Sequence, residues 1–181
     1  RFATHGDYVQ LQYSPLAGGN TDFSYSMWLR VEDLEPSSPR WGATGSLGVV
    51  GFTQIDGLTD CPGLSPSLWV SRDGSLQTAM CHSTDDPKFQ NEAADTFAAP
   101  SDATWTHIAW TKAGVKHSLF RNGEMQSSSN PLAASTTYYS SSSLWIGRVD
   151  TFFVGDISDI AIFNFALPRA HVRQHVVWNV Y

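Results

Sequence analysis

The sequence of 181 residues predicts an all-β protein, a two-sheet antiparallel β-sandwich with one short C-terminal helix. Two observations lead to this prediction: apolar and polar residues alternate with period two along most of the chain, and clusters of turn-forming residues separate the alternating segments. Helical periodicity is almost absent. Because neither a linker nor an internal repeat divides the sequence, we expect residues 1–181 to form a single domain.

Three strands are expected in the first third of the chain, at residues 8–11, 23–31 and 47–53. The segment 23–31 alternates most clearly, because its odd-numbered residues are all apolar or aromatic. Its even-numbered residues are Ser24, Ser26, Trp28 and Arg30. We therefore expect the odd-numbered face of this strand to lie in the core.

The middle of the chain combines a predicted hairpin with irregular segments. Residues 67–80 are expected to form the hairpin, with Asp73 and Gly74 at its tip, because Asp-Gly favours a tight type I′ turn. Residues 36–44 are rich in Pro, Ser and Gly and are interpreted as a loop. The polar segment 82–102 is expected to be irregular.

Consecutive antiparallel strands are expected over residues 105–126, with turns at 113–114 and 122–123. The stretch 127–143 is dominated by Ser, Thr and Ala and is interpreted as a loop, with a frayed edge strand as the alternative.

The last two strands are predicted at residues 144–147 and 155–163. The only predicted helix follows at residues 168–177. Pro168 suits its first turn, because the amide hydrogen that proline lacks would have no partner there.

Composition and charge exclude several classes of partner. The formal net charge is −6 and no cluster of Lys and Arg occurs, so nucleic acid is not an expected partner. No apolar run approaches the roughly 20 residues that span a bilayer, so membrane insertion is not expected. The chain begins at Arg1 without a signal peptide and is interpreted as an excised domain or a processed mature chain. The sequence leaves its oligomeric state open.

Six segments of the sequence carry motifs whose order resembles that of the laminin G-like domains of the concanavalin A-like lectin/glucanase superfamily. A Trp-x-His-hydrophobic-Ala strand precedes an Asn-Gly hairpin, and Leu-x-Ile-Gly and Phe-x-Gly-x-Ile strands follow. These motifs and the matching opening strands lie at residues 6–9, 23–29, 105–110, 119–124, 144–148 and 153–164. The resemblance implies a concanavalin A-like jelly roll. This fold hosts lectins, adhesion modules, pentraxins and some glycanases, so the fold alone does not specify the ligand.

The two cysteines, Cys61 and Cys81, are expected to form a disulfide. The chain between them is short, so a bond between neighbouring loops or strands is geometrically easy. The extracellular character of the resembling family favours oxidation. Two buried thiols are the alternative.

The resemblance also implies a rim site for Ca²⁺, a hard cation that prefers several oxygen ligands. The aspartates near matching motifs that we expect as ligands are Asp7, Asp22 and Asp156. Asp7 and Asp156 belong to the first strand and the last long strand, which we expect to pair when the jelly roll closes. The alternative is that these aspartates are solvated or cap turns.

Aromatic residues in apparent loops predict a ligand-binding face, because sugar rings stack on exposed aromatic side chains. The candidates are Trp41, Tyr138, Tyr139 and Phe152. Trp28 alternates onto the polar side of its strand and either joins that face or lies beneath a loop.

No catalytic constellation is recognised, and the protein is not expected to be an enzyme. Retaining glycanases need two carboxyl groups close together, but Glu32, Asp33 and Glu35 have the wrong spacing. His171 and His175 lie one helical turn apart, yet the Glu of a His-Glu-x-x-His zinc motif is missing.

The sequence therefore predicts a non-catalytic, lectin-like recognition module that binds carbohydrate through its loop rim, in an extracellular or cell-surface protein. The expected partner is a glycan or an extracellular protein. One alternative is a protein-adhesion or structural module of a larger extracellular assembly without sugar binding. A second alternative is an unusual glycanase.

Overall fold

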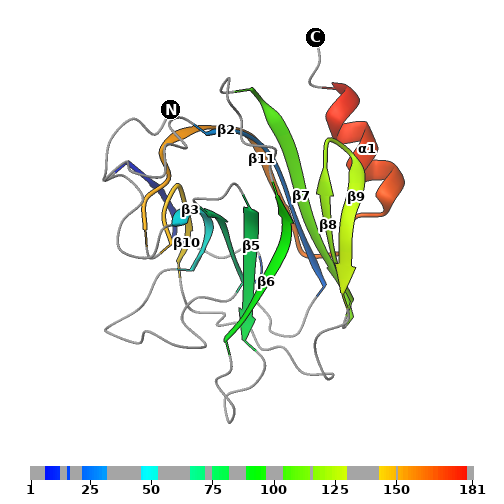
Figure 1. Cartoon of the computed structure of the whole chain (residues 1–181), viewed down its shortest axis with the longest axis horizontal. Helices are drawn as coiled ribbons and strands as arrows, with labels where there is room; N and C mark the ends of the chain where they lie inside the picture. The colour runs from blue at the N-terminus through cyan, green and yellow to red at the C-terminus, as the bar shows by residue number, and fades with distance from the viewer. Residues whose placement is uncertain are drawn as a thin grey trace.

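The computed structural model describes residues 7–12, 16, 22–31, 46–52, 66–71, 75–81, 89–96, 104–114, 116–129, 143–149 and 151–178. These residues form two antiparallel sheets that face each other, with one helix outside the sandwich (Figure 1). The all-β sandwich predicted from the alternation is therefore confirmed.

The larger sheet contains six strands. In spatial order they are β1 (Val9–Leu11), β10 (Leu144–Ile146), β3 (Ser46–Phe52), β4 (Ser67–Ser71), β5 (Ser75–Cys81) and β6 (Phe89–Thr96). Strand β6 contradicts the expectation that residues 82–102 are irregular, because it pairs with β5 from Cys81↔Phe89 to Ser75↔Thr96. An edge strand is bonded through its backbone on one side, so it needs little apolar character to form.

The smaller sheet contains five strands. In spatial order they are β11 (Gly155–Phe163), β2 (Phe23–Val31), β7 (Thr106–Ala113), β8 (Lys116–Arg121) and β9 (Glu124–Ser129). The predicted turn at 122–123 is confirmed, because Asn122 and Gly123 both have positive φ angles, 49° and 78°. Strand β9 continues to Ser129, three residues into the segment that was interpreted as a loop.

The core lies between the two sheets and contains the odd-numbered residues of β2, as the alternation predicts. The rings of Phe23 and Trp110 meet edge to face with centroids 4.8 Å apart. The Tyr25 hydroxyl donates a hydrogen bond to the carbonyl of Pro66, immediately before β4, at 3.3 Å. Complete burial raises the pKa of Tyr25 far above its ordinary value, so this tyrosine stays neutral.

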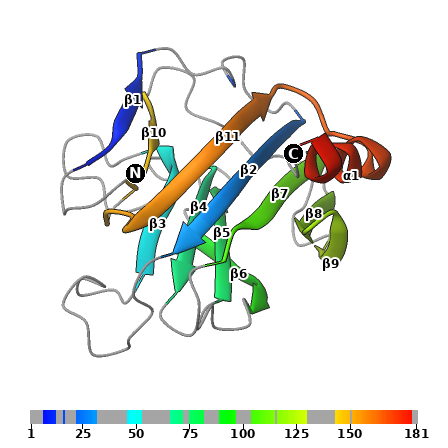
Figure 2. The same cartoon turned by 90° about the horizontal axis from the view of Figure 1, so that it is seen from above.

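On the even-numbered face of β2, Ser24 and Ser26 are buried, because helix α1 (Arg169–Trp178) covers that side of the five-stranded sheet (Figure 2). Trp28 and Arg30 on the same face are half-buried. The Ser24 hydroxyl accepts a hydrogen bond from the Leu167 amide at 2.7 Å and donates to the Phe165 carbonyl at 3.0 Å. These two bonds hold the segment that leads into the helix. Within the described residues, no helix is long and apolar enough to cross a membrane.

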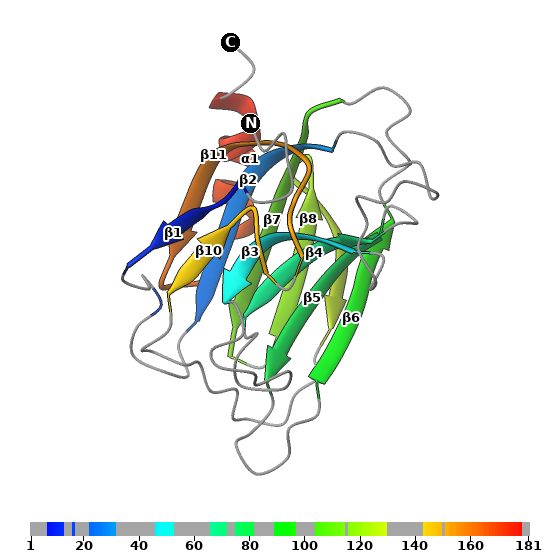
Figure 3. The same ribbon diagram turned by 90° about the vertical axis from the view of Figure 1, so that its left-hand side faces the viewer.

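The first strand does not pair with the last one, and the expectation that placed Asp7 and Asp156 on paired strands is wrong. Strand β1 pairs with β10 at the edge of the six-stranded sheet (Figure 3). Strand β11 pairs with β2 in the other sheet. The sandwich closes in this way because β10, a separate short strand before β11, supplies the free edge that β1 joins.

A tight connection over residues 147–153 joins β10 towards β11 and lies against β3. The Gly147 amide donates to the Val49 carbonyl at 2.7 Å, and the Phe153 amide donates to the Gly147 carbonyl at 2.9 Å. Gly48 allows the close approach, because a Cβ atom there would lie 2.5 Å from both the Thr151 carbonyl oxygen and the Val149 nitrogen.

We predict that Gly48→Ala lowers the free energy of unfolding by about 1–3 kcal/mol, because two backbone atoms would have to move to admit one methyl group. The matched control is Gly114→Asn, since Gly114 has a φ of 57° that asparagine tolerates and open space around its Cβ position. The control is expected to change stability by no more than about 0.5 kcal/mol. Urea denaturation of both variants measures the difference, and equal midpoints would contradict the prediction.

Candidate functional site

In the connection between β10 and β11, the side chains of Arg148 and Phe152 face away from the core, because Val149 and Phe153 are buried in it. Val149 and Phe153 are buried and fix the backbone of the connection. Arg148 and Phe152 form an isolated antiparallel bridge. Residues opposite each other in such a bridge project to the same side. Arg148 and Phe152 therefore project away from the core, together.

The two neighbouring strands add two more rings to this position. Leu144 and Ile146 of β10 face the core, so Trp145 between them faces outwards. Gln10 pairs with Trp145 across the β1–β10 ladder, and Tyr8 lies two residues before Gln10. Tyr8, Gln10 and Trp145 therefore share the outer face at the edge of the six-stranded sheet shown in Figure 3.

These residues form a compact surface feature, which we name the aromatic–arginine cluster: Tyr8, Trp145, Arg148 and Phe152. The rings of Tyr8 and Trp145 are 4.5 Å apart, and those of Tyr8 and Phe152 are 6.5 Å apart. The Arg148 guanidinium carbon lies 5.0 Å from the Trp145 and Phe152 ring centres and 5.4 Å from that of Tyr8. Such distances are favourable for cation–π attraction.

The cluster is accessible to a ligand and has polar groups beside it. Tyr8 is 43% exposed, and Trp145, Arg148 and Phe152 are half-buried. Next to Trp145, the Gln10 side-chain amide donates a hydrogen bond to the Ser143 hydroxyl at 2.9 Å in an exposed position. Aromatic surface with a few polar groups at its margin is the usual composition of a small-ligand site. The rings can stack on an apolar ligand face while the polar groups orient it.

Of the four aromatic residues that the sequence nominated for ligand contact, Phe152 is placed in this cluster. Trp41, Tyr138 and Tyr139 lie outside the described residues. Three members were missed: Tyr8, Trp145 and Arg148. Trp145 carried a usable signal, because a tryptophan between Leu144 and Ile146 in a short strand must face opposite to both.

The three aspartates predicted as calcium ligands are not brought together. The Asp22 carboxylate accepts a hydrogen bond from the Gly114 amide at 2.7 Å, at the turn between β7 and β8. The Asp156 carboxylate accepts two hydrogen bonds from Arg30, at 2.6 and 2.8 Å. In the described part of the chain, no three His, Cys, Asp or Glu side chains gather closely enough to hold a metal ion. Calcium binding remains a prediction.

The remaining sequence candidates fall partly outside the described residues. Cys61 and the acidic residues at 32, 33 and 35 lie outside them, and Cys81 ends β5 with its side chain not described. The Cys61–Cys81 disulfide therefore remains a prediction. Trp28 is half-buried on β2 and meets the His107 ring edge to face at 5.4 Å.

A second polar cluster lies beneath helix α1 and consists of Ser26, His107 and His175. The Ser26 hydroxyl is 2.9 Å from His107 Nε2 and 2.9 Å from His175 Nδ1. Burial, followed by the charge of His175, lowers the pKa of His107 to about 4, so this imidazole is neutral near pH 7. The Ser26 hydroxyl, shared between the two imidazoles, links the helix to β2 and β7. This cluster is therefore structural.

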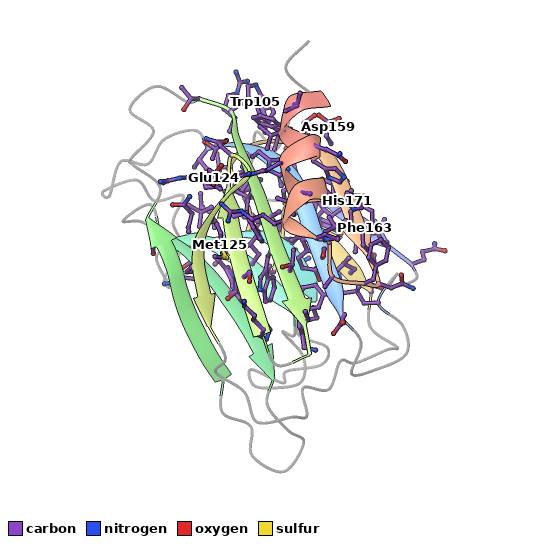
Figure 4. All side chains as sticks on the ribbon, turned by 90° about the vertical axis from the view of Figure 1, so that its right-hand side faces the viewer. Trp105, Glu124, Met125, Asp159, Phe163 and His171 are labelled. Atoms are coloured by element: carbon purple, nitrogen blue, oxygen red, sulfur yellow. The ribbon has the colours of Figure 1, made fainter. Side chains whose placement is uncertain are left out.

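Two arginines add a surface clamp to the same helix. Arg169 and Arg173 donate hydrogen bonds to the two oxygens of Glu124, at 2.7 and 2.6 Å (Figure 4). These bonds hold the pKa of the Glu124 carboxyl below its ordinary value. His171 lies exposed on the helix, while His175 is turned towards the sheet, so the two histidines do not act together.

Comparison with known proteins identifies the family. A family model for the concanavalin A-like lectin/glucanases superfamily, of the Laminin_G_3 type, matches residues 3–173. No curated protein sequence matches the chain.

Among solved structures, the fold is similar to domain 4 of AbnA, an extracellular arabinanase of Geobacillus stearothermophilus described in complex with arabinotriose. The identity is 17%, the match covers 92% of this chain and 71% of that chain, and the TM-score is 0.61.

The fold is also similar to two botulinum neurotoxin structures. For the serotype D binding domain, the identity is 15%, the coverage is 98% of this chain and 41% of that chain, and the TM-score is 0.66. The second is botulinum neurotoxin type C, whose cell entry depends on two ganglioside molecules. Here the identity is 15%, the coverage is 89% of this chain and 36% of that chain, and the TM-score is 0.62. The chain spans less than half of either toxin chain. At these identities, the likeness shows a shared fold.

We predict that acidification destabilises the fold through its buried histidines. Burial, with Lys112 as the second cause, also lowers the pKa of His117 to about 4. An unfolded chain protonates histidine near pH 6.5. Protons therefore bind the unfolded state first, and stability that is complete above pH 6.5 is lost as the pH falls towards 4.

Between pH 7 and pH 5, the free energy of unfolding is expected to fall by roughly 2 kcal/mol for each of His107 and His117. Chemical denaturation at the two pH values measures this loss. His117→Gln should reduce the loss, whereas His171→Gln, which replaces an exposed histidine, should leave it unchanged. An identical free energy of unfolding at both pH values would refute the prediction.

Proposed function

We propose, since the chain belongs to the concanavalin A-like lectin/glucanases superfamily, that it is a non-catalytic module that binds carbohydrate through the aromatic–arginine cluster. The observation that carries this proposal is the gathering of three rings from separate segments on one accessible face. Sugar rings present flat C–H faces that stack on aromatic side chains, and their hydroxyls bond to neighbouring amides and hydroxyls. The cluster and the adjacent Gln10 and Ser143 offer both kinds of contact.

The rigidity of the cluster supports binding. Phe152 and Arg148 are carried by a connection whose backbone is hydrogen-bonded to itself and to β3. Trp145 is carried by a strand paired on both sides. A ligand that binds pre-positioned side chains loses less conformational entropy at the interface than one that must order them.

A non-catalytic role is supported by the way in which carboxylates are used. Glycoside hydrolysis needs a carboxylic acid and a second carboxylate facing the bond that breaks. Asp156 is bonded to Arg30, and Glu124 is bonded to Arg169 and Arg173, so both carboxylates are engaged with arginine side chains. Two proteins of similar fold agree with this role: an arabinanase domain in complex with arabinotriose and the binding domain of botulinum neurotoxin serotype D.

We place the module in a secreted or cell-surface protein, where glycans are the abundant partners. Two similar structures belong to an extracellular arabinanase and to a toxin whose cell entry depends on gangliosides. An acidic surface without a basic cluster is compatible with this environment.

We predict that Trp145→Ala weakens glycan binding at least tenfold, which corresponds to about 1.4 kcal/mol. A glycan array identifies a ligand for the unmodified protein, and titration calorimetry then compares the variants. Tyr8→Ala is the second variant, because this exposed ring can be removed with little effect on the fold. Phe165→Ala is the matched control, since Phe165 is a 49% exposed aromatic outside the cluster.

The control is expected to bind as the unmodified protein does, and thermal melting checks that every variant is folded. If no glycan on the array binds, the proposal is wrong and a protein-adhesion module becomes the better hypothesis. Binding that survives both Trp145→Ala and Tyr8→Ala would show that carbohydrate is held elsewhere on the molecule.

A further inference from the structure

Arg148 differs from every other arginine in the part of the chain that the structure describes. Arg30 is bonded to Asp156, Arg169 and Arg173 to Glu124, and Arg121 to Gln126. The Arg148 guanidinium contacts three aromatic rings but forms no hydrogen bond or ion pair with any of those residues. Its N–H groups therefore have no acceptor among the described side chains.

A guanidinium whose N–H donors have no side-chain acceptor can bind an anion. Arginine stays charged at every physiological pH and carries five N–H donors in a planar arrangement. Two of these donors match the two oxygens of a carboxylate or a sulfate. Cation–π contacts with the rings do not consume the N–H donors of the guanidinium. The rings also restrict the side chain, so less entropy is lost when an anion binds.

The charge of the protein makes this cation distinctive. The chain carries a formal net charge of −6, so its general surface repels anions. The ion pairs formed among the described residues join Asp156 to Arg30 and Glu124 to Arg169 and Arg173, and none of them involves Arg148. A positive group held among rings on an acidic protein favours a ligand that combines a sugar face with a localised negative charge.

We propose that the aromatic–arginine cluster selects acidic glycans, that is, sugars bearing a carboxylate or sulfate group. This inference rests on the proposed carbohydrate-binding function. The rings of Tyr8, Trp145 and Phe152 contact the sugar face, while the edge of the Arg148 guanidinium binds the oxyanion. The charge-assisted hydrogen bonds distinguish an acidic sugar from its neutral parent, which can only stack.

The test compares acidic oligosaccharides with neutral parents of the same size. Sialyllactose against lactose tests a carboxylate, and a 6-sulfated galactose disaccharide against its unsulfated form tests a sulfate. Titration calorimetry at 50 and 300 mM NaCl gives the affinities. We expect the unmodified protein to prefer at least one acidic partner by about tenfold or more, and this preference to shrink at the higher salt concentration.

Arg148→Gln should abolish the preference, because it should weaken binding of the acidic sugar by about tenfold more than it weakens binding of the neutral parent. Arg148→Lys keeps the charge but loses the planar donor pair, so it should retain only part of the preference. Arg121→Gln is the matched control, since it removes the same charge from an arginine outside the cluster. It should leave the preference intact.

The outcomes separate this inference from the proposed function. If the unmodified protein binds acidic and neutral sugars equally, or Arg148→Gln weakens both to the same degree, acidic selection is wrong and carbohydrate binding stands. If no sugar of either kind binds, both proposals are wrong. Loss of the preference in Arg121→Gln would show that the overall charge of the protein, rather than Arg148, controls selection.

Discussion

Strand β2 buries an apolar face and, opposite it, the hydroxyls of Ser24 and Ser26, and the arrangement of the sheets and the helix follows from this requirement. Its odd-numbered face packs with the six-stranded sheet around the rings of Phe23, Tyr25 and Trp110. Its even-numbered face bears hydroxyls that cannot be left unsatisfied away from water. Helix α1 and the segment before it supply the missing partners through Ser24 and Ser26. A buried polar face therefore fixes where the helix docks, and the apolar face determines how the sheets meet.

The aromatic–arginine cluster depends on the same core, although it lies at the opposite edge of the fold. Val149 and Phe153 insert into the core, which directs the residue before each of them, Arg148 and Phe152, to the surface. Gly48 brings that connection close to β3. The surface chemistry is thus set by residues that a ligand never touches. A substitution in this anchoring layer would displace the rings as a group.

Much of the fold could be predicted from the sequence, because a long alternating segment such as residues 23–31 specifies both a strand and the face that enters the core. Strand β6 was missed because its residues are largely polar and it forms through backbone pairing with β5. The site was predicted only in part. Phe152 was recognised as a loop aromatic, but Tyr8 and Trp145 are 137 positions apart, and their meeting depends on β1 pairing with β10 rather than with β11. Local pattern does not determine which strands become neighbours.

Because Tyr8 lies next to β1, ligand binding at the aromatic–arginine cluster is linked to the pairing of β1 with β10. Strand β1 has three residues and is paired on one side only, with β10. Short edge elements of this kind open locally at a small cost in free energy, without unfolding of the domain. When β1 detaches, the Tyr8 ring leaves while Trp145, Arg148 and Phe152 stay in place. A ligand that contacts all three rings would therefore hold β1 closed by mass action. Ligand binding would in this way shift the local opening equilibrium of β1 towards the state in which β1 is paired with β10.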